Sequence, residues 1–203
     1  MNYEVKSIDY QDCKEWFLKK HYAKRIPSIS YCFGLFEDVK LIGVCSIGKP
    51  ASPSLCVGVC GENESKFVYE LNRLIINDGL PKNTLSWFVS QCIKKLPPMI
   101  LVSYADSQQG HYGYIYQATN FLYSGATKER TDIGTENGTH SRHYKIGETE
   151  RKFRSSKHRY IYFIGNMKKQ WLKKLKYPIE PYPKGDNKRY DASYTPIVQT
   201  KLL

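Results

Sequence analysis

Groups that can move protons are concentrated in the segment SYADSQQGHYGYIYQATNF, which follows the apolar stretch MILV. Such a stretch is typical of a buried strand. A carboxylate at the end of that strand is well placed to contact a ligand, because open α/β sheets bind ligands beyond the carboxyl ends of their strands. Asp106 is therefore a candidate general base or metal ligand. Its alternative role is to cap the helix that starts near Gly110.

Two neighbours extend this candidate catalytic group. His111 follows Asp106 closely enough to share one cleft with it, as a proton shuttle or metal ligand, or it is an ordinary surface histidine. Tyr104 alternates with Ser103 and Ala105, so Tyr104 and Asp106 point to the same side of the strand. Tyr104 is therefore a candidate for stacking on a base, with a place in the core as the alternative.

A second strand, predicted over KFVYELNRLIIN, contains one charge of each sign. Glu70 and Arg73 are three residues apart, so they lie on opposite faces of a regular strand, although a bulge would change which of them enters the cleft. A glutamate is rarely tolerated in a central strand without a partner. We favour Arg73 as the contact to an anion or a cofactor.

Positive charge accumulates late in the chain. The formal charge is +12, and residues 128–190 hold seventeen Lys and Arg against seven Asp and Glu. This predicts a polyanionic partner, with nucleic acid ahead of an anionic membrane and a merely solubilising face as the alternative. The candidate phosphate contacts are His21, Lys24, Arg25, Arg142, His143, Lys157, His158 and Arg159. Favourable charge at a helix C-terminus explains the first three equally well, and a solvated loop explains the others.

The alternation of apolar strands and amphipathic helices predicts one mixed α/β (α+β) domain. Strands are expected over 3–8, 28–36, 39–48, 66–77, 99–106, 121–127 and 158–165, and helices over 9–22, 78–98, 112–119 and 166–176. Asp9 and Asn83 are the expected helix caps. The domain covers residues 1–177 and includes an exposed basic insertion at 128–156. Residues 178–203 form an irregular, proline-rich basic tail.

Bulk features indicate a soluble protein without membrane contact. The chain has no run of about 18 apolar residues, and its N-terminus lacks the layout of a signal peptide. The six cysteines are therefore expected to be reduced and mostly buried. Cys56 and Cys60 could share a metal, but packing is the preferred explanation because no second pair of this kind occurs.

The order of elements resembles the GNAT acyltransferase fold, and two motifs strengthen that resemblance. ELNRLIIN is similar to the central GNAT strand, and YQATNF to the helix and strand entry at which that family has a tyrosine. The resemblance implies that Tyr116 protonates a departing thiolate of coenzyme A, beside Asn120 in place of the usual glycine. The segment NDGLPKNTLS departs from the glycine-rich phosphate loop that is usual in that family, but Asn83 and Ser86 could still supply amide and hydroxyl contacts to a cofactor at the helix N-terminus.

A narrower resemblance rests on the motifs HYAKRIPS, ELNRL, NTLSWF, SYAD, GHYGYIYQATNF, KHRY and LKYPIEPYPK. Together they are similar to the Mom family of phage DNA-modification proteins. The resemblance implies a GNAT-like enzyme that converts the N6 amine of adenine in phage DNA to a carbamoylmethyl derivative, shielding the DNA from host restriction enzymes. It further implies action in the cytoplasm of the infected bacterial host.

This implied activity defines the partner and leaves the donor open. Adenine N6 is buried in the duplex, so the expected substrate is double-stranded DNA with a flipped adenine. Carbonyl transfer from acetyl-CoA would give an N-acyl adenine, whereas a carbamoylmethyl group attaches through its methylene carbon. Acetyl-CoA, another acyl or glycyl donor, and an iron centre on Asp106, His111 and a histidine of the insertion all remain candidates.

Two other functions are compatible with parts of the sequence. An ordinary N-acetyltransferase of a protein or small amine would not require the concentrated basic insertion. A non-catalytic DNA-binding protein would not require Asp106, His111 and Tyr116 together. A homodimer is compatible with each of these functions.

Overall fold

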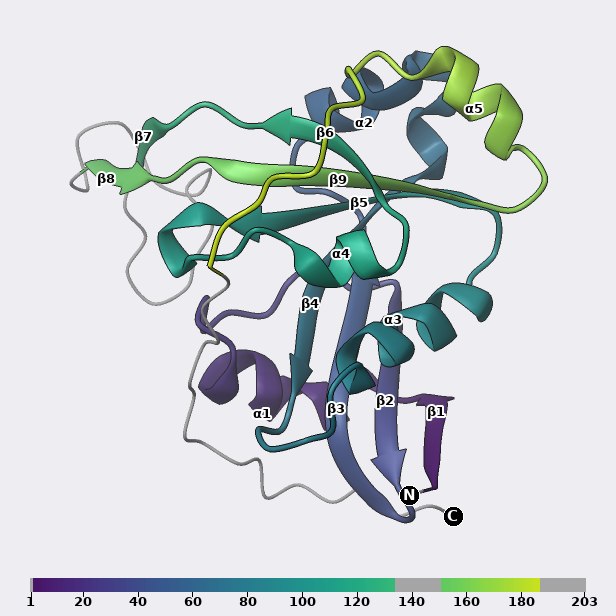
Figure 1. The fold of residues 1–203 in the computed structure, drawn as a ribbon, viewed down its shortest axis with the longest axis vertical. Helices are drawn as coiled ribbons and strands as arrows, with labels where there is room; N and C mark the ends of the chain where they lie inside the picture. The colour runs from purple at the N-terminus through teal and green to yellow at the C-terminus, as the bar shows by residue number, and fades with distance from the viewer. Residues whose placement is uncertain (1, 134–150, 187–203) are drawn as a thin grey trace.

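A computed structural model describes residues 2–133 and 151–186, and it forms the predicted mixed α/β domain. A seven-stranded sheet has the order β1-β2-β3-β4-β5-β9-β6 (Figure 1). Its strands are β1 (Tyr3–Ser7), β2 (Tyr31–Glu37), β3 (Lys40–Gly48), β4 (Val68–Ile76), β5 (Met99–Asp106), β6 (Leu122–Ala126) and β9 (Lys157–Ile164). Within this sheet β4 and β5 pair in parallel, and the other neighbours pair antiparallel.

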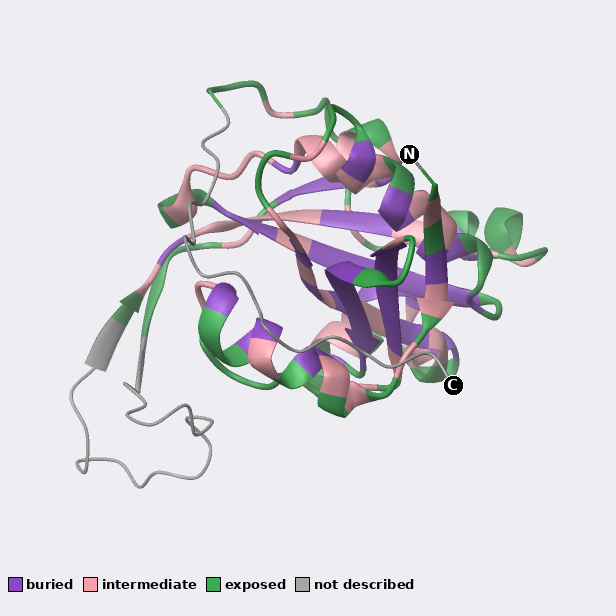
Figure 2. Ribbon diagram, turned by 90° about the horizontal axis from the view of Figure 1, so that it is seen from below, coloured by how far each residue is buried: buried purple, intermediate pink, exposed green. Residues whose placement is uncertain are grey.

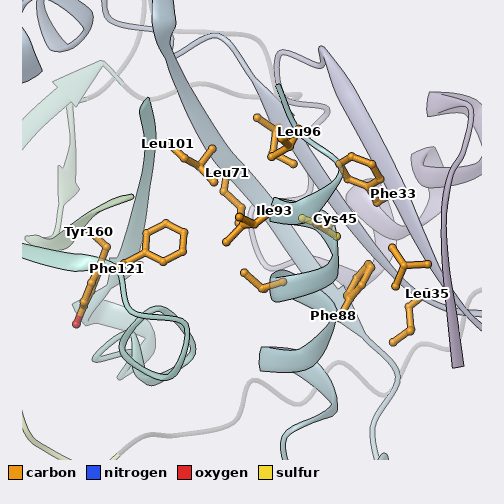
Figure 3. Close-up of a cluster of buried hydrophobic side chains, with 14 of the residues drawn as sticks. Phe33, Leu35, Cys45, Leu71, Phe88, Ile93, Leu96, Leu101, Phe121 and Tyr160 are labelled. Carbon is orange, nitrogen blue, oxygen red and sulfur yellow. The ribbon is translucent and has the colours of Figure 1, made fainter. Parts of the chain in front are cut away.

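Helices cover both faces of the sheet. On one face lie α3 (Thr84–Lys94) and α4 (Tyr114–Ala118), and Phe88 of α3 packs beside apolar side chains of β2 and β3 (Figure 3). On the other lie α1 (Tyr10–Glu15), the π-helical turn η1 (Trp16–Lys20), α2 (Pro53–Cys60), the 3-10 helix η2 (Glu62–Phe67) and α5 (Lys168–Lys174). Buried residues therefore follow the strands, and exposed ones the outer sides of the helices (Figure 2).

The strand β5 shows why a continuous apolar run belongs in the middle of such a sheet. Residues 99–103 are buried on both faces, because α3 and α4 cover one side and α2 and α5 the other. Fully burying a Leu, Ile or Val side chain contributes about 1.5–3 kcal/mol. No helix in the described parts of the chain is both long enough and apolar enough to cross a bilayer.

A β-bulge in β4 changes the expected direction of its charged side chains. Against β3 the register shifts between the partners of Leu71 and Arg73, so Asn72 is the extra residue. Residues on either side of a bulge no longer alternate as in a regular strand. Glu70 and Arg73 consequently lie on the same face, the one that α1 and α2 cover, and not on the opposite faces that regular spacing predicts.

The strands β4 and β5 separate beyond residues 71 and 103. Their parallel pairing covers only Val68 to Leu71 on β4, although both strands continue beyond it. The last link is a side-chain contact, in which Ser103 Oγ donates to the carbonyl oxygen of Leu71 at 3.0 Å. The space between the diverging strands is where a site can form.

The helical predictions require three corrections. The sequence predicts one helix over 9–22, whereas α1 ends at Glu15 and a π-helical turn follows; Asp9 caps α1 as predicted, accepting from Gln11 N at 2.8 Å. Residues 53–60 form α2, which was not predicted, with Ser52 as its cap. Asn83 precedes α3 in a left-handed conformation (φ 71°) and its side chain makes no capping hydrogen bond.

Both ends of the predicted insertion at 128–156 contain a β-strand. β7 (Arg130–Ile133) and β8 (Arg151–Arg154) pair as an antiparallel ribbon that projects from the sheet (Figure 1). The segment 134–150 between them, and the end of the tail from 187, lie outside the described residues.

Residues 175–186 form an extended strap along β6 and α4. Glu180 N donates to Tyr123 O at 3.0 Å, and Tyr182 Oη donates to Phe121 O at 2.8 Å. At its far end Tyr114 Oη donates to the carbonyl oxygen of Gly185 at 2.6 Å. The strap therefore holds α4 against the edge of the sheet.

Candidate active site

Residues from five parts of the chain meet where β4 and β5 separate. They come from the end of the first helical region, from β4, from the end of β5, from the turn after β5 and from the start of β9. The ring of Tyr22 contacts both His21 and His111. Burial lowers the pKa of His21, and the charges of Arg73, His111, Arg25 and Lys157 lower it further. The site lies on the face of the sheet that α1 and α2 cover.

Tyr22 lies at the centre of this cluster, and the sequence patterns did not single it out. Its ring stacks on His21 with centroids 4.3 Å apart and meets His111 edge-on at 6.2 Å. Burial raises the pKa of its hydroxyl to about 12, and the negative charge of Asp106 adds to that shift. Tyr22 therefore stays protonated at neutral pH. The only signal for Tyr22 in the sequence is its position between His21 and Lys24 in the motif HYAKR.

His21 is a neutral member of the site and not a cationic phosphate contact. Burial lowers its pKa to about 3, and the positive charge of Arg73 acts in the same direction. Ala23 N donates to His21 Nδ1 at 3.0 Å, which places the ring proton on Nε2. His111 is similar, because burial lowers its pKa while Asp106 opposes the shift.

Asp106 is a cap, although of a shorter and earlier element than the helix near Gly110, and two further donors hold its carboxylate. It caps the short 3-10 helix at Ser107–Gln109 by accepting from Gln108 N at 3.1 Å. Its two oxygens also accept from Ser155 Oγ and Lys157 Nζ, each at 2.6 Å. Burial alone would raise the pKa of Asp106, but the hydrogen bonds from Lys157 and Ser155 lower it overall. This carboxylate is thus well held, negatively charged and weakly basic.

Glu70 has the opposite character and is the better proton acceptor. Burial raises its pKa, and the charges of Arg73 and Lys157 only partly offset that effect. Arg73 is only 7% exposed; its guanidinium donates to Asn72 O at 2.6 Å and Arg25 O at 3.1 Å, while its Nε has no partner. Burial lowers the pKa of Arg73 to about 10, so it remains charged at neutral pH. The site therefore places a fixed cation beside a basic carboxylate.

Tyr104 lies on the same face as Asp106, as the alternation along β5 predicts. It packs beside the apolar cluster under α2 and α5, and burial together with the charge of Glu70 raises the pKa of its hydroxyl. Arg159 hydrogen-bonds this hydroxyl and lies 3.5 Å from the ring centre of Tyr177. Tyr104 therefore forms a wall of the site next to Glu70.

Tyr116 reaches the separation of β4 and β5 from the opposite face of the sheet. Its ring packs against Phe121 and Tyr160, each with centroids 5.3 Å away. Burial raises the pKa of its hydroxyl despite a hydrogen bond with Ser103. Gly113 permits this approach, because its φ is 76° and a Cβ there would collide with the ring of Tyr160. Tyr116 thus remains a protonated donor, aimed at the gap from the side of α4.

The residues predicted to contact a cofactor do not line one common binding site. Asn83 and Thr84 line a cavity of about 530 Å³ between the start of α3 and β1, together with Trp87. Ser86 Oγ donates to the carbonyl oxygen of Asn83 at 3.0 Å. Asn120 is exposed and has a left-handed backbone conformation (φ 61°), which explains why glycine is usual at this position.

The predicted DNA contacts fall into three groups. Lys24 and Arg25 are exposed beside the site. His158 and Arg159 are engaged within the protein: His158 Nδ1 lies 3.0 Å from Tyr123 Oη, and Arg159 donates to Ser124 Oγ at 2.9 Å. Lys157 is paired with Asp106, so these three residues are better explained as supports of the site than as phosphate contacts. Arg142 and His143 lie outside the described residues.

The described residues provide no metal site. They contain no group of three His, Cys, Asp or Glu side chains placed to hold a metal ion. The carboxylate of Asp106 is already occupied by Lys157 and Ser155, and the histidines of the insertion lie outside the described ranges. Cys60 is buried with its thiol donating to Trp171 O at 3.5 Å, which fits packing.

The separated strands, with a tyrosine-bearing helix after β5, define a GNAT-like domain. Solved structures share the fold: yncA from Salmonella typhimurium, solved with acetyl-CoA, has a TM-score of 0.50 at 11% identity and covers 82% of this chain and 96% of its own. NAA60 from Arabidopsis thaliana in complex with acetyl-CoA has a TM-score of 0.51 at 10% identity, with 81% and 100% coverage.

The sequence comparison identifies the family within this fold. The model of the Mom protein family matches residues 2–184, so the chain belongs to that family. Its relative from Escherichia phage Mu, named methylcarbamoylase mom, is 29% identical over 187 residues, which cover 81% of this chain and 77% of that protein. The resemblance inferred from the motifs is confirmed.

Both of these solved structures contain acetyl-CoA. The residues of this chain match a coenzyme A site only in part. Tyr116 offers a protonated hydroxyl for a leaving group at the strand gap. The approach to α3, however, has a single glycine, Gly79, and a left-handed Asn83 in place of a glycine-rich loop that presents successive N–H groups to phosphates. We therefore assign no step to coenzyme A.

Proposed function

We propose that this protein modifies adenine in double-stranded DNA, replacing one proton of the N6 amine by a carbamoylmethyl group. The proposal rests on the shared face of Glu70 and Arg73 beside Tyr22, in a chain of the Mom family. The name of the phage Mu relative, a methylcarbamoylase, fits this chemistry. The product would protect phage DNA from restriction enzymes in the cytoplasm of the infected host.

The chemistry follows from the protonation states of the site. The flipped adenine presents N6 to Glu70, which accepts its proton as the bond from N6 to the methylene carbon of the donor forms. The bond between that carbon and its leaving group breaks, and Tyr116 protonates the departing group. Arg73 stabilises the carbonyl oxygen of the transferred acetamide group. The donor class is thus an acetamide group activated at its methylene carbon.

Mass analysis of nucleosides from cells that express the protein tests this reaction. A deoxyadenosine with the mass of one added carbamoylmethyl group is the expected product. An acetylated protein or small amine with unmodified DNA would identify an ordinary N-acetyltransferase instead. Bound but chemically unchanged DNA would identify a non-catalytic binding protein.

Replacement of Tyr116 by Phe should lower the modification rate by about 10²–10⁴-fold, the usual contribution of a general acid. The ring contacts with Phe121 and Tyr160 remain, so the variant should fold. Initial rates of adenine modification measure the effect, and Tyr10→Phe on α1 is a matched control away from the site. A rate equal to that of the wild type would exclude Tyr116 as the acid.

DNA binding should weaken steeply with salt, because residues 128–190 carry seventeen basic against seven acidic side chains. A protein that makes about six to ten phosphate contacts loses about 10³–10⁵-fold in affinity between 50 and 200 mM salt. Titrations of a fluorescent duplex at several salt concentrations measure the slope. An affinity that hardly changes over this range would contradict a phosphate-driven interface.

A further inference from the structure

The helix α5 presents a dense group of lysines on the face of the sheet that holds the candidate site. It lies beside α2, and its Trp171 packs into the same apolar cluster as Tyr104, which forms a wall of the site (Figure 1). Five of the nine residues from 168 to 176 are lysines. All five are exposed, namely Lys168, Lys169, Lys173, Lys174 and Lys176.

The fold fixes one side of α5 and directs the other to solvent. Trp171 is fully buried, and its Nε1 donates to Glu64 Oε2 at 2.8 Å. Lys174 Nζ donates to the other oxygen of Glu64 at 2.5 Å, so this lysine is used within the protein. At 3.6 residues per turn, the positions two before and two after Trp171 lie on the opposite side of the helix. These positions are Lys169 and Lys173, which therefore point outward side by side.

The two outward lysines do not stabilise the helix that carries them. Like charges four residues apart on a helix repel each other, and Lys169 also lies in the first turn, where a positive charge is unfavourable. Within residues 2–133 and 151–186, neither Lys169 nor Lys173 forms an ion pair. An anion bound between the two ammonium groups would remove their repulsion.

The composition of this surface indicates which anion fits it. A helix that binds a membrane surface buries a broad apolar face in the lipid. In α5 the Trp171 ring points into the protein, which leaves Leu172, at 41% exposure, as the single exposed apolar side chain of the helix. Lysines without an apolar face are suited to the phosphates of nucleic acid, which they contact as point charges.

Principles of strand and duplex geometry relate α5 to the site. The ring of Trp171 lies 6.3 Å from that of Phe163, which is six residues along β9 from Lys157, the partner of Asp106. At the rise of an extended strand this separation is about 20 Å. A DNA strand has one phosphate per about 3.4 Å of helix axis, so the same length corresponds to about six base pairs.

We propose that Lys169 and Lys173 of α5 bind the phosphate backbone of the substrate duplex, about six base pairs from the flipped adenine. The inference rests on the proposed function, because the partner is the DNA that the site modifies. Phosphate contacts of this kind fix the register and orientation of a duplex without reading its sequence. The helix α5 thus holds the duplex along the sheet while the adenine enters the site.

The salt dependence of DNA binding by the double variant Lys169→Gln/Lys173→Gln tests this surface without any donor. Each phosphate contact contributes about 0.9 to the slope of log affinity against log salt, so the slope should become shallower by about 1.8. Between 50 and 200 mM salt the wild type should therefore lose about 12-fold more affinity than the variant. Anisotropy titrations of a labelled duplex measure both slopes.

Two matched variants and one modified duplex separate this contact from net charge. Lys169→Arg/Lys173→Arg keeps both charges and should keep the wild-type slope. Lys94→Gln/Lys95→Gln removes the same charge from exposed residues at the end of α3, on the other face of the sheet, and should also keep it. Neutral methylphosphonates placed about six base pairs from a single adenine should make the wild-type slope shallower but leave that of Lys169→Gln/Lys173→Gln unchanged.

Three outcomes would overturn the inference. One is a wild-type slope in Lys169→Gln/Lys173→Gln, another is an equal change in the α3 control, and the third is a loss confined to binding of anionic lipid vesicles. The result is separable from the proposed reaction. If the slope depends on α5 but adenine stays unmodified in cells, the DNA surface holds and the reaction fails. If adenine is modified while the variant binds DNA with the wild-type slope, the role of α5 alone is wrong.

Discussion

Glu70→Gln is expected to reduce adenine modification by about 10²–10⁴-fold, the usual contribution of a general base. Glutamine keeps the size of the side chain and its hydrogen-bonding atoms but has no basicity. Glu70 is the acceptor because burial raises its pKa, whereas the lysine partner of Asp106 keeps that carboxylate weakly basic. Arg73 lies on the same face through the bulge at Asn72 and remains available to the donor.

The pH dependence gives this prediction a second measurement. The deprotonated carboxylate accepts the proton, so the wild-type rate should rise with pH through the raised pKa of Glu70, and this rise should be missing in the variant. A raised pKa also means that the folded protein prefers the neutral form. Near neutral pH, Glu70→Gln should therefore be at least as stable as the wild type in a thermal melt.

The exposed Glu62 in η2 provides a matched control for the same chemical change. Glu62→Gln should leave rate, pH profile and melting temperature close to those of the wild type. If Glu70→Gln modifies adenine at the wild-type rate, or if its pH profile keeps the same rise, the base is another residue.

Asp106→Asn is also expected to abolish modification, but with the opposite effect on stability. Asp106 holds Lys157 and Ser155 at 2.6 Å each, and these contacts fix the end of β5 to the start of β9. Asparagine can still cap the turn, but it loses the charged hydrogen bond with Lys157, whose side chain is 37% exposed. We expect a loss of about 1–2 kcal/mol after screening by solvent. The displaced Lys157 would leave the site misaligned and inactive.

The direction of the pKa shift defines the pH range in which this loss appears. The pKa of Asp106 is lowered in the folded protein, so its stabilising effect is present above the unfolded pKa and is lost as the pH falls through the folded one. The melting temperatures of variant and wild type should therefore converge in acid. DNA affinity should stay the same or rise slightly, because a negative charge near the phosphates is removed.

Ser155→Ala separates the charge of Asp106 from its hydrogen bonds. It removes one donor to the carboxylate and leaves the pair with Lys157 intact. Its effects on stability and rate should be clearly smaller than those of Asp106→Asn. Equal effects of the two variants would show that the loop around Ser155, and not the charge of Asp106, is what the site requires.

Much of the sheet was predictable from the chain alone. The hairpin of β2 and β3, the buried strand β5 and the amphipathic helix α3 follow from local patterns, because alternation and helical periodicity are written along contiguous residues. The helix α2 was missed, since SLCVGVC has β-branched residues and a glycine without one apolar side. The π-helical turn after Glu15 was missed because packing of Trp16 and Phe17 between α1 and the sheet overrides local preference.

The sequence by itself determined the kinds of groups at the site and the strand end at which Asp106 lies. Only the tertiary structure decided how they are used. Glu70 and Arg73 share a face because β3 pairs with β4 across a bulge, and Asp106 is weakly basic because the register of β9 brings Lys157 to it. Tyr22 becomes central because the segment after η1 brings its ring to His111, in the turn after β5. Each of these contacts joins residues far apart in the chain, and a local pattern contains no information about such pairings.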